Sequence, residues 1–487
     1  MKKTLSVFLA ALLLAVSLAA PSFAMTQTEW EAYLATDPDA YDGVIMQPGA
    51  DGTQKNFSWY APAETEQVAV VISTSPDLAG AREYPGRTIR TYQGDKAAKV
   101  TVTDLRPATT YYYACRTDGV NSGVYSFTTA AADRFSALYV TDIHVSETED
   151  PAELSRTALK FNEVVTQAQT KADLSYILSA GDQASSGLRS EYVAMTAGQA
   201  QKSLTFALTM GNHDRKGVDY KYFKNLPNES VKFVSDYQTG DYWFAQNDVL
   251  FLFLDSNSGS GADHRAAMKA AVRSCPNARW RVAVMHHDLY SSAIPHRESE
   301  TRLMRLLWSP LFDEFNIDLA LLGHSHYYSV TNVLYNGKGT MAVENGGTVT
   351  NAPGTVYMVS TSLTRPRGEE PAFSDKVAIG LTEDLTRTLY NILDFSKNAI
   401  TVRTYDFGTG ELFASCTLEK TDDFSPKTIN LFRKIMGFIS AAIGTVYAWF
   451  NNFHVFSDLK EKGYDVDFMD AVNNNFLSEG RIVGGIG

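Results

Sequence analysis

TMGNHD, residues 209–214, follows the apolar run 204–208, which we predict to be a short buried strand. Gly211 gives the backbone the freedom that a tight turn needs, so Asn212 and His213 stand at the mouth of that strand. Polar loops that follow strands are where α/β sheets place reactive side chains. Taken alone, however, the motif fits equally well a capped turn before the next helix.

Four other predicted strands end in polar residues of the same kind. Each is a short, nearly continuous apolar run, as expected for strands covered by helices on both faces. Residues 135–141 are followed by Asp142 and His144, 174–180 by Gly181 and Asp182, 280–285 by His286 and His287, and 317–322 by Gly323, His324, Ser325 and His326. Helical stretches such as 152–171 and 264–274 lie between them. We therefore expect an α/β domain with all five polar clusters along one edge of a sheet.

The residue types in these clusters predict a metal site. Histidines combine there with Asp142, Asp182 and Asn212, and imidazole mixed with carboxylate and amide oxygen suits first-row divalent metals better than calcium or a thiolate site. The candidate ligands exceed what one ion can take, so we expect two ions. Asp182, alone beside Gly181, is the natural carboxylate to bridge them. Two ions roughly 3.5–4 Å apart would make a bound water acidic and clamp a phosphoryl oxygen.

The N-terminus predicts export. Residues 1–24 combine two lysines, a short apolar run and a small-residue cleavage pattern, which is typical of a secretory signal peptide. Removing this segment moves the formal charge from −12 to −14, and so acidic a chain is not expected to bind nucleic acid. Three cysteines, Cys115, Cys275 and Cys416, are too few for a disulfide framework.

Composition divides the remaining chain into three parts. Residues 39–131 alternate short apolar runs with turn formers, which predicts a β-sandwich domain, and they contain no histidine. Residues 134–420 form the predicted α/β catalytic domain, which closes with antiparallel strands over 391–420. Residues 421–487 are a tail with an apolar stretch at 435–457. That stretch fits a helix docked on the catalytic domain, an interfacial helix in contact with a membrane surface, or a spanning helix.

The ordered series DxH, GD, GNHD, HH and GHSH resembles the calcineurin-like metallophosphoesterase superfamily. The β domain, with LRPATTYYYACRTDG and SGVYSFTTA, resembles the fibronectin-type-III-like N-terminal domain of purple acid phosphatases. The similarity covers about residues 39–420. It implies a two-sheet metallophosphoesterase sandwich flanked by helices and preceded by an all-β sandwich.

The resemblance also implies roles for particular residues. One metal would be held by Asp142, His144, Asp182 and His326, and the other by Asp182, Asn212, His286 and His324. His213 would be the general acid or contact the phosphate, work that an imidazole can do near neutral pH. His287 and His296 would line the substrate site, although His296 could equally be an ordinary loop residue.

The sequence departs from purple acid phosphatases at the metals. The tyrosine that binds their ferric iron is replaced by Ser185, and they lack the counterpart of His144. We therefore expect two divalent or mixed-valence ions of Fe, Zn or Mn, without the purple colour.

These observations predict an exported phosphoesterase in which metal-bound hydroxide attacks phosphorus. A phosphomonoesterase acting on a small phosphate ester is the first expectation, because of the domain pairing. A phosphodiesterase acting on nucleotides or lipid head groups is the alternative. A binding module without turnover would show broken ligand motifs, and none is broken here.

Overall fold

The computed structural model describes residues 28, 30–32, 43–148, 150–230, 240–290, 298–367, 371, 373–425 and 431–461. The predicted signal peptide, His296 and the chain after residue 461 lie outside these residues.

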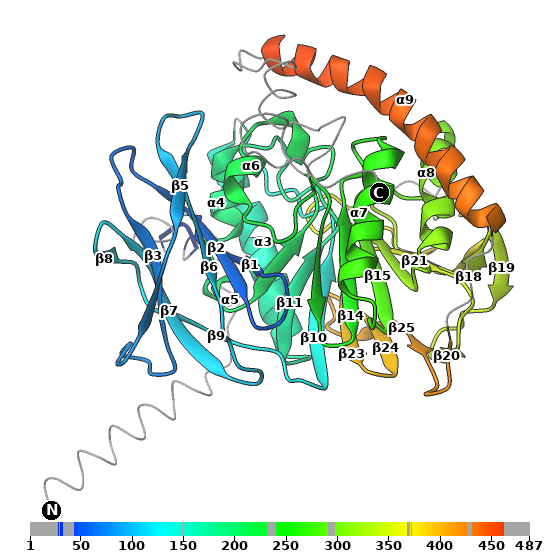
Figure 1. Cartoon of the computed structure of the whole chain (residues 1–487), viewed down its shortest axis with the longest axis horizontal. Helices are drawn as coiled ribbons and strands as arrows, with labels where there is room; N and C mark the ends of the chain where they lie inside the picture. Colours follow the sequence, from blue (N-terminus) through cyan, green and yellow to red (C-terminus); the bar gives the residue numbers. More distant parts are fainter. Residues whose placement is uncertain are drawn as a thin grey trace, which may run out of the picture.

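The N-terminal part is a sandwich of two antiparallel sheets, as predicted (Figure 1). Alternate residues of the strands meet between the sheets in one core, which includes Phe57, Val70 and Tyr113. One sheet has the order β1 (Ile45–Pro48), β2 (Lys55–Ala61), β6 (Lys96–Val102), β5 (Arg87–Arg90); the other has β4 (Arg82–Pro85), β3 (Val68–Ser73), β7 (Thr110–Thr117), β8 (Val120–Asn121), with β9 (Tyr125–Thr128) also paired to β7.

The α/β part is built on two seven-stranded sheets rather than one. The first has the order β12 (Thr205–Leu208), β11 (Leu174–Ser179), β10 (Arg134–Val140), β23 (Leu389–Ser396), β24 (Ala399–Asp406), β25 (Leu412–Glu419), β20 (Gly347–Thr350). The second has β13 (Tyr242–Gln246), β14 (Val249–Leu254), β15 (Trp280–Met285), β16 (Leu319–Leu322), β21 (Val356–Val359), β17 (Ser329–Thr331), β22 (Val377–Gly380). A hairpin of β18 (Val333–Tyr335) and β19 (Lys338–Met341) adjoins them.

Strand alternation explains the layers of the α/β part. In β14, Phe251 and Phe253 enter the core between the two sheets, whereas Leu250 and Leu252 face the helix side. Because both faces are covered, the strand contains six buried apolar residues in a row. The sheets are therefore the two inner layers of a four-layer sandwich.

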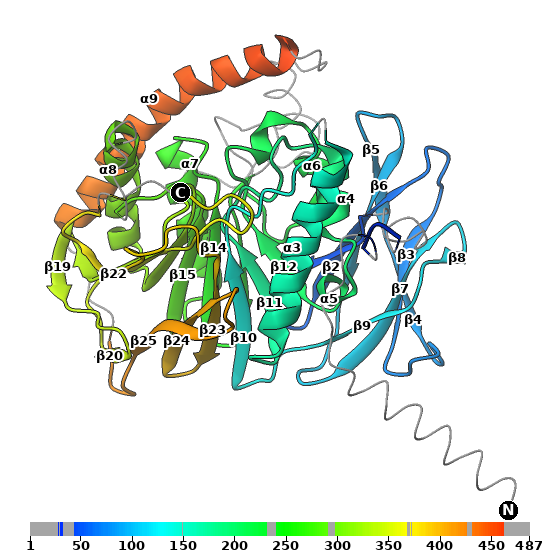
Figure 2. The same cartoon turned by 180° about the vertical axis from the view of Figure 1, so that it is seen from behind.

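Helices form the two outer layers (Figures 1 and 2). The first sheet is covered by the helix layer that contains α3. Asp150 caps α3 by accepting from the Ala152 N–H at 3.0 Å. The second sheet is covered by α7 and α8. The helices are α3 (Pro151–Gln169), α4 (Arg189–Met195), α5 (Gln199–Lys202), α6 (Tyr220–Phe223), α7 (Gly261–Ser274), α8 (Glu298–Glu314) and α9 (Leu431–Glu461), with a 3-10 turn η2 (Asp214–Lys216).

The tail helix α9 packs across α7 and α8, which agrees with the docked alternative (Figure 1). Small residues make the close approach possible, since a Cβ on Gly444 would overlap the backbone of Gly259. Ser440 Oγ donates to the carbonyls of Leu306 and Leu307 at 2.8 Å. Among the described residues, no helix is long and apolar enough to cross a membrane.

Candidate active site

The five polar clusters converge at the edge where the two sheets meet. Asp142, Asp182 and Asn212 follow strands of the first sheet, whereas His286 and His324 follow strands of the second. Our expectation of one sheet edge is therefore wrong in that respect. The sequence correctly predicts that each cluster follows a strand, but periodicity does not show to which sheet a strand belongs.

The backbone is in an unusual conformation at five of the predicted ligands. Their φ angles are positive: 49° at Asp142, 50° at His144, 52° at Asp182, 72° at His324 and 65° at His326. Non-glycine residues adopt this left-handed region rarely, at a cost of order 1–3 kcal/mol each. Such conformations cluster at functional sites, where the surrounding structure holds them in place.

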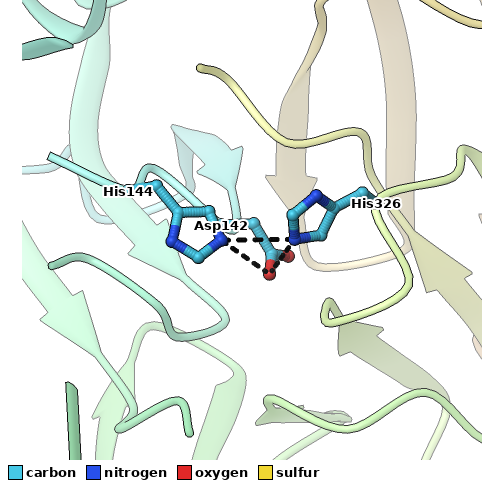
Figure 3. Close-up of side chains that lie close together, drawn as sticks. All are labelled: Asp142, His144 and His326. Carbon is cyan, nitrogen blue, oxygen red and sulfur yellow. Dashed lines mark hydrogen bonds and ion pairs between the residues drawn. The ribbon is translucent and has the colours of Figure 1, made fainter. Parts of the chain in front are cut away.

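The first donor group consists of Asp142, His144 and His326 (Figure 3). His326 Nε2 lies 3.2 Å from Asp142 Oδ1 and 3.2 Å from His144 Nε2. His326 Nδ1 is 2.8 Å from the Arg365 carbonyl, to which it donates its proton, so that Nε2 presents a lone pair. Three electron-pair donors thus face one another in a buried place.

The second donor group consists of Asn212, His286 and His324. Asn212 Oδ1 lies 2.9 Å from both His286 Nε2 and His324 Nδ1, and these two nitrogens are 3.2 Å apart. His286 Nδ1 donates to the Ala180 carbonyl at 2.9 Å, which again leaves Nε2 as the free donor atom.

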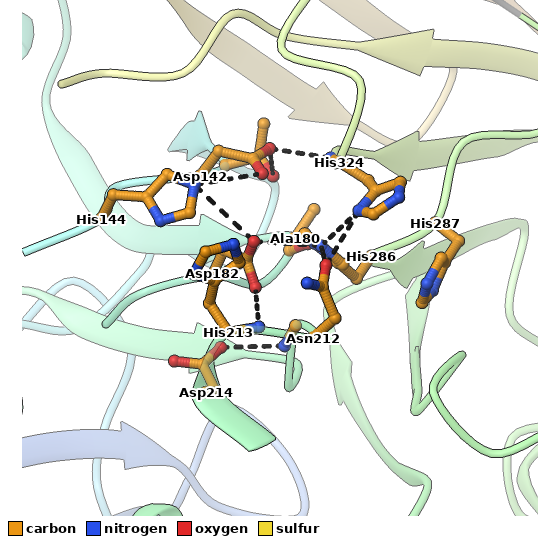
Figure 4. A network of polar contacts seen from close by, with 12 residues as sticks. Asp142, His144, Ala180, Asp182, Asn212, His213, Asp214, His286, His287 and His324 are labelled. Carbon is orange, nitrogen blue, oxygen red and sulfur yellow. Dashed lines mark hydrogen bonds and ion pairs between the residues drawn. The ribbon is translucent and has the colours of Figure 1, made fainter. Parts of the chain in front are cut away.

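Asp182 lies between the two groups (Figure 4). Its Oδ2 is 3.7 Å from His144 Nε2 in the first group and 3.3 Å from His286 Nε2 in the second. Its Oδ1 accepts the His213 backbone N–H at 2.7 Å. One carboxylate therefore contacts both sets of imidazoles.

The electrostatics show that this site calls for positive charge. Burial lowers the pKa of His144 to about 3, in spite of the nearby carboxylates, so this imidazole is neutral and able to bind a metal. Burial also opposes a proton on His286, but Asp182 and Asp142 outweigh it and raise the pKa of His286 to about 9. The same attraction offsets the burial of Asp182 and lowers its pKa to about 2. A divalent cation would supply this charge and pair the facing nitrogen and oxygen atoms, so the donor set fits a bound metal.

His213 lies beside the first donor group without belonging to it. Its ring centroid is 4.6 Å from that of His144, and its Nδ1 is 2.7 Å from the Ser185 carbonyl. Lys216 Nζ lies 2.6 Å from the same Nδ1. Burial, together with the charges of Lys216 and Arg365, lowers the pKa of His213 below its ordinary value, although Asp182 opposes this.

Of the two predicted substrate histidines, His287 is among the described residues. His287 is buried at the second donor group, with its Nδ1 2.8 Å from Ser256 Oγ and its ring 4.6 Å from that of His324. His296 lies outside the described residues.

The structure also places at the site four residues to which the sequence analysis gave no role. Glu300 Oε2 is 3.3 Å from His324 Nε2, and Arg365 and Arg367 line a cavity of about 220 Å³ with His144, Asp182, Asn212, His213, His324 and His326. Asp214 is buried below the turn, where burial and Asp182 raise its pKa to about 7. Only Asp214, inside GNHD, had a sequence signal that could have found it.

Two family models match successive parts of the chain. Residues 41–129 match the family model of the purple acid phosphatase N-terminal domain, and residues 135–328 match that of the calcineurin-like phosphoesterases. Two Mycobacterium tuberculosis proteins, uncharacterized protein MT2654 (strain CDC 1551 / Oshkosh) and uncharacterized protein Rv2577 (strain ATCC 25618 / H37Rv), are each 32% identical over 87 residues. That stretch is 17% of this chain and only 16% of the length of either relative.

Solved structures agree on the fold. Purple acid phosphatase PPD1 from yellow lupin (Lupinus luteus) seeds superposes with a TM-score of 0.62 at 13% identity, over 81% of this chain and 78% of that one. PhoD superposes with a TM-score of 0.53 at 10% identity, over 88% and 99%. These superpositions, at 10–13% identity, show that the chain shares the fold of the two solved proteins. The fold therefore agrees with the two family models, the calcineurin-like phosphoesterase model over residues 135–328 and the purple acid phosphatase N-terminal model over 41–129.

Proposed function

We propose that this protein is an exported phosphomonoesterase that works with two metal ions bridged by Asp182. The observation that carries the proposal is the position of Asp182 Oδ2, 3.7 Å from His144 Nε2 and 3.3 Å from His286 Nε2. A carboxylate in contact with two separate imidazole groups is what a bridged pair of ions requires. Export rests on the predicted signal peptide, residues 1–24.

The ligand sets follow from the two donor groups. One ion would be held by Asp142, His144, His326 and Asp182; the other would be held by Asn212, His286, His324 and Asp182. Mixed nitrogen and oxygen donors suit Fe, Zn or Mn. When bound, such a pair supplies an acidic water as the nucleophile and positive charge for the phosphoryl oxygens.

The protein's own groups would then guide the reaction. His213 lines the cavity but has no place in either ligand set, so its imidazole, when protonated below its lowered pKa, can donate a proton to the leaving oxygen. Lys216, 2.6 Å from His213 Nδ1, orients that ring. His287, beside His324, would contact the ester group, and His296 remains a second candidate for that role.

Metal analysis and a pair of aryl esters test this function. Purified wild-type protein should contain two first-row metal ions per chain, hydrolyse an aryl phosphate monoester faster than the matched diester, and lose activity on chelation. Asp182→Asn should lose metal and activity together. Asp133→Asn, at an exposed aspartate just before β10, should retain both. Faster diester hydrolysis would favour the phosphodiesterase alternative, and a metal-loaded protein that hydrolyses neither ester would overturn the proposal.

His213→Ala tests the acid role separately. The expected result is full metal content with kcat lowered about 10²- to 10⁴-fold, because the leaving oxygen would depart without its proton donor. The loss should be smaller for an aryl ester whose leaving group is a weaker base. Unchanged kcat on a poor leaving group would remove His213 from the mechanism.

We also propose that helix α9 contacts a lipid surface, which is the interfacial alternative given for residues 435–457 from the sequence. Its docked face combines the buried Arg433 with small residues such as Ser440 and Gly444. Its outer face exposes large apolar side chains: Leu431, Phe432, Ile435, Phe438, Ile439, Ile443 and Val446. Residues 435–457 contain no Asp, Glu, Lys or Arg, and His454 is the one residue there that can carry a charge near neutral pH, so this face suits an uncharged bilayer surface better than a charged partner. Binding to zwitterionic vesicles that is lost in Phe438→Ser/Ile439→Ser would support the contact, and a stable dimer in place of vesicle binding would refute it.

A further inference from the structure

Two arginines that belong to none of the metal-site motifs face the catalytic cavity. Arg365 and Arg367 lie on the segment after β21 and line the same cavity of about 220 Å³ as Asp182 and His213. So small a cavity accommodates a phosphoryl group in contact with the metal donors and the two guanidinium groups at once.

The arginine segment is fixed to the metal site through backbone contacts. Ser362 Oγ donates to the Asp142 carbonyl at 2.7 Å, and Thr364 Oγ1 donates to the Ile143 carbonyl at 2.8 Å. The Arg365 carbonyl accepts from His326 Nδ1 at 2.8 Å. The segment that contains the arginines is therefore held beside the donor groups by contacts that do not use the arginine side chains.

The side chains themselves are not used up by structural contacts. Within the described part of the chain, the Arg365 guanidinium donates one hydrogen bond, from Nη2 to Ser146 Oγ at 3.1 Å. Arg367 Nε is buried and makes no hydrogen bond with any described residue. Among the described residues, neither guanidinium lies within ion-pair distance of a carboxylate. A buried guanidinium nitrogen without a partner is costly unless a ligand supplies an acceptor.

We infer that Arg365 and Arg367 bind the non-bridging oxygens of a dianionic phosphomonoester and thereby select monoesters over diesters. A monoester has three non-bridging oxygens and two negative charges, so oxygens remain for the arginines after others meet the metal side. A diester has one charge fewer, and its second ester group would occupy the place of an oxygen that a guanidinium binds. The planar guanidinium matches paired phosphate oxygens better than an ammonium does. This inference rests on the proposed phosphomonoesterase function and names the residues that give it specificity.

The test compares Arg365→Gln, Arg367→Gln and the double variant with wild type. Metal content is measured first, and it should be unchanged because the contact to His326 uses the backbone carbonyl of Arg365. Each single variant should lower kcat/KM for the aryl monoester about tenfold to a hundredfold, the loss typical of a hydrogen bond to a charged group. The matched diester should change less than about threefold, so the ratio of the two rates falls. Arg134→Gln, an exposed arginine at the opposite end of β10, is the control and should match wild type in both.

Binding of inorganic phosphate gives a readout that is independent of turnover. Calorimetry on metal-loaded protein should show that the dissociation constant for inorganic phosphate rises at least tenfold in the double variant. Arg367→Lys, which keeps the positive charge, should bind phosphate more tightly than Arg367→Gln. An unchanged phosphate dissociation constant, or equal loss of monoester and diester hydrolysis, would overturn the inference. If wild type hydrolyses neither ester, the proposed function fails, while phosphate binding still decides whether the arginines hold a phosphate.

Discussion

Gly211 packs directly against Asp182, so that a methyl group on the Gly211 Cα would overlap both Oδ1 and the backbone nitrogen of Asp182. The same turn also binds the Asp182 carboxylate through its backbone, because the His213 N–H donates to Asp182 Oδ1 at 2.7 Å. The glycine of GNHD is therefore needed for close approach. Its φ is not in the left-handed region, so conformational freedom is not what the position requires.

Gly211→Ala should displace Asp182. Because the overlap is with the carboxylate and with backbone, neither of which can move away cheaply, the free energy of unfolding should fall by about 1–3 kcal/mol. Metal content and kcat should fall with it. Denaturant unfolding and elemental analysis measure both effects. Gly339→Ala, where an added Cβ meets nothing within 4 Å, is the matched control, and a fully loaded, fully active Gly211→Ala protein would contradict the prediction.

Asp214 holds the loop after β11 and the loop after β12 together. Its carboxylate accepts four hydrogen bonds, from the N–H groups of Gly211 (2.8 Å), Gln183 (3.3 Å) and Ala184 (3.0 Å) and from Tyr192 Oη (3.0 Å). Asp214→Ala leaves these buried donors without an acceptor, which should cost about 1–3 kcal/mol or more. Asp214→Asn keeps one acceptor oxygen and should lose less.

The measurement is denaturant unfolding of the apo protein, so that metal binding does not contribute. The exposed Asp133→Ala serves as control and should lie within about 0.5 kcal/mol of wild type. Equal stability of Asp214→Ala and wild type would show that water replaces the carboxylate.

The strands and their reactive ends could be predicted from the sequence because buried strands carry a local signal. The predicted run 280–285 is β15 (Trp280–Met285), and the predicted run 174–180 contains β11 (Leu174–Ser179). The division into two sheets could not be predicted this way, since β10 pairs with β23 across more than 250 residues. Pairing at that separation leaves no periodicity in the sequence.

The residues that sequence reasoning missed are those whose role depends on tertiary position. Glu300 reaches His324 from the first turn of α8, and Arg367 reaches the cavity from the segment after β21. Charged residues in such places look like solvated surface groups when read along the chain. Asp142 and His326, by contrast, stand within four residues of the ends of β10 and β16, where position along the chain is enough to place them.

Lys55 gives a prediction about stability and pH that is independent of the metals. This lysine of β2 is buried against the α/β part, with its Nζ 3.2 Å from Tyr176 Oη, and burial lowers its pKa to about 7. In the unfolded chain the pKa of lysine is about 10.4. Between these values the unfolded state binds the extra proton, so this residue makes the free energy of unfolding rise with pH; below about pH 7 both states are protonated and the rise stops.

Lys55→Met should therefore stabilise the protein most at pH 7 and below, because it replaces a buried charged side chain with an uncharged one of similar shape. Its advantage over wild type should shrink by about 2 kcal/mol between pH 7 and pH 9, at 1.36 kcal/mol per pKa unit. Urea unfolding at both pH values, on apo protein, measures this difference. Lys338→Met, at an exposed lysine of β19, should leave the pH dependence of wild type intact. A Lys55→Met protein whose stability follows the wild-type pH dependence in parallel would mean that Lys55 keeps its proton in the folded state.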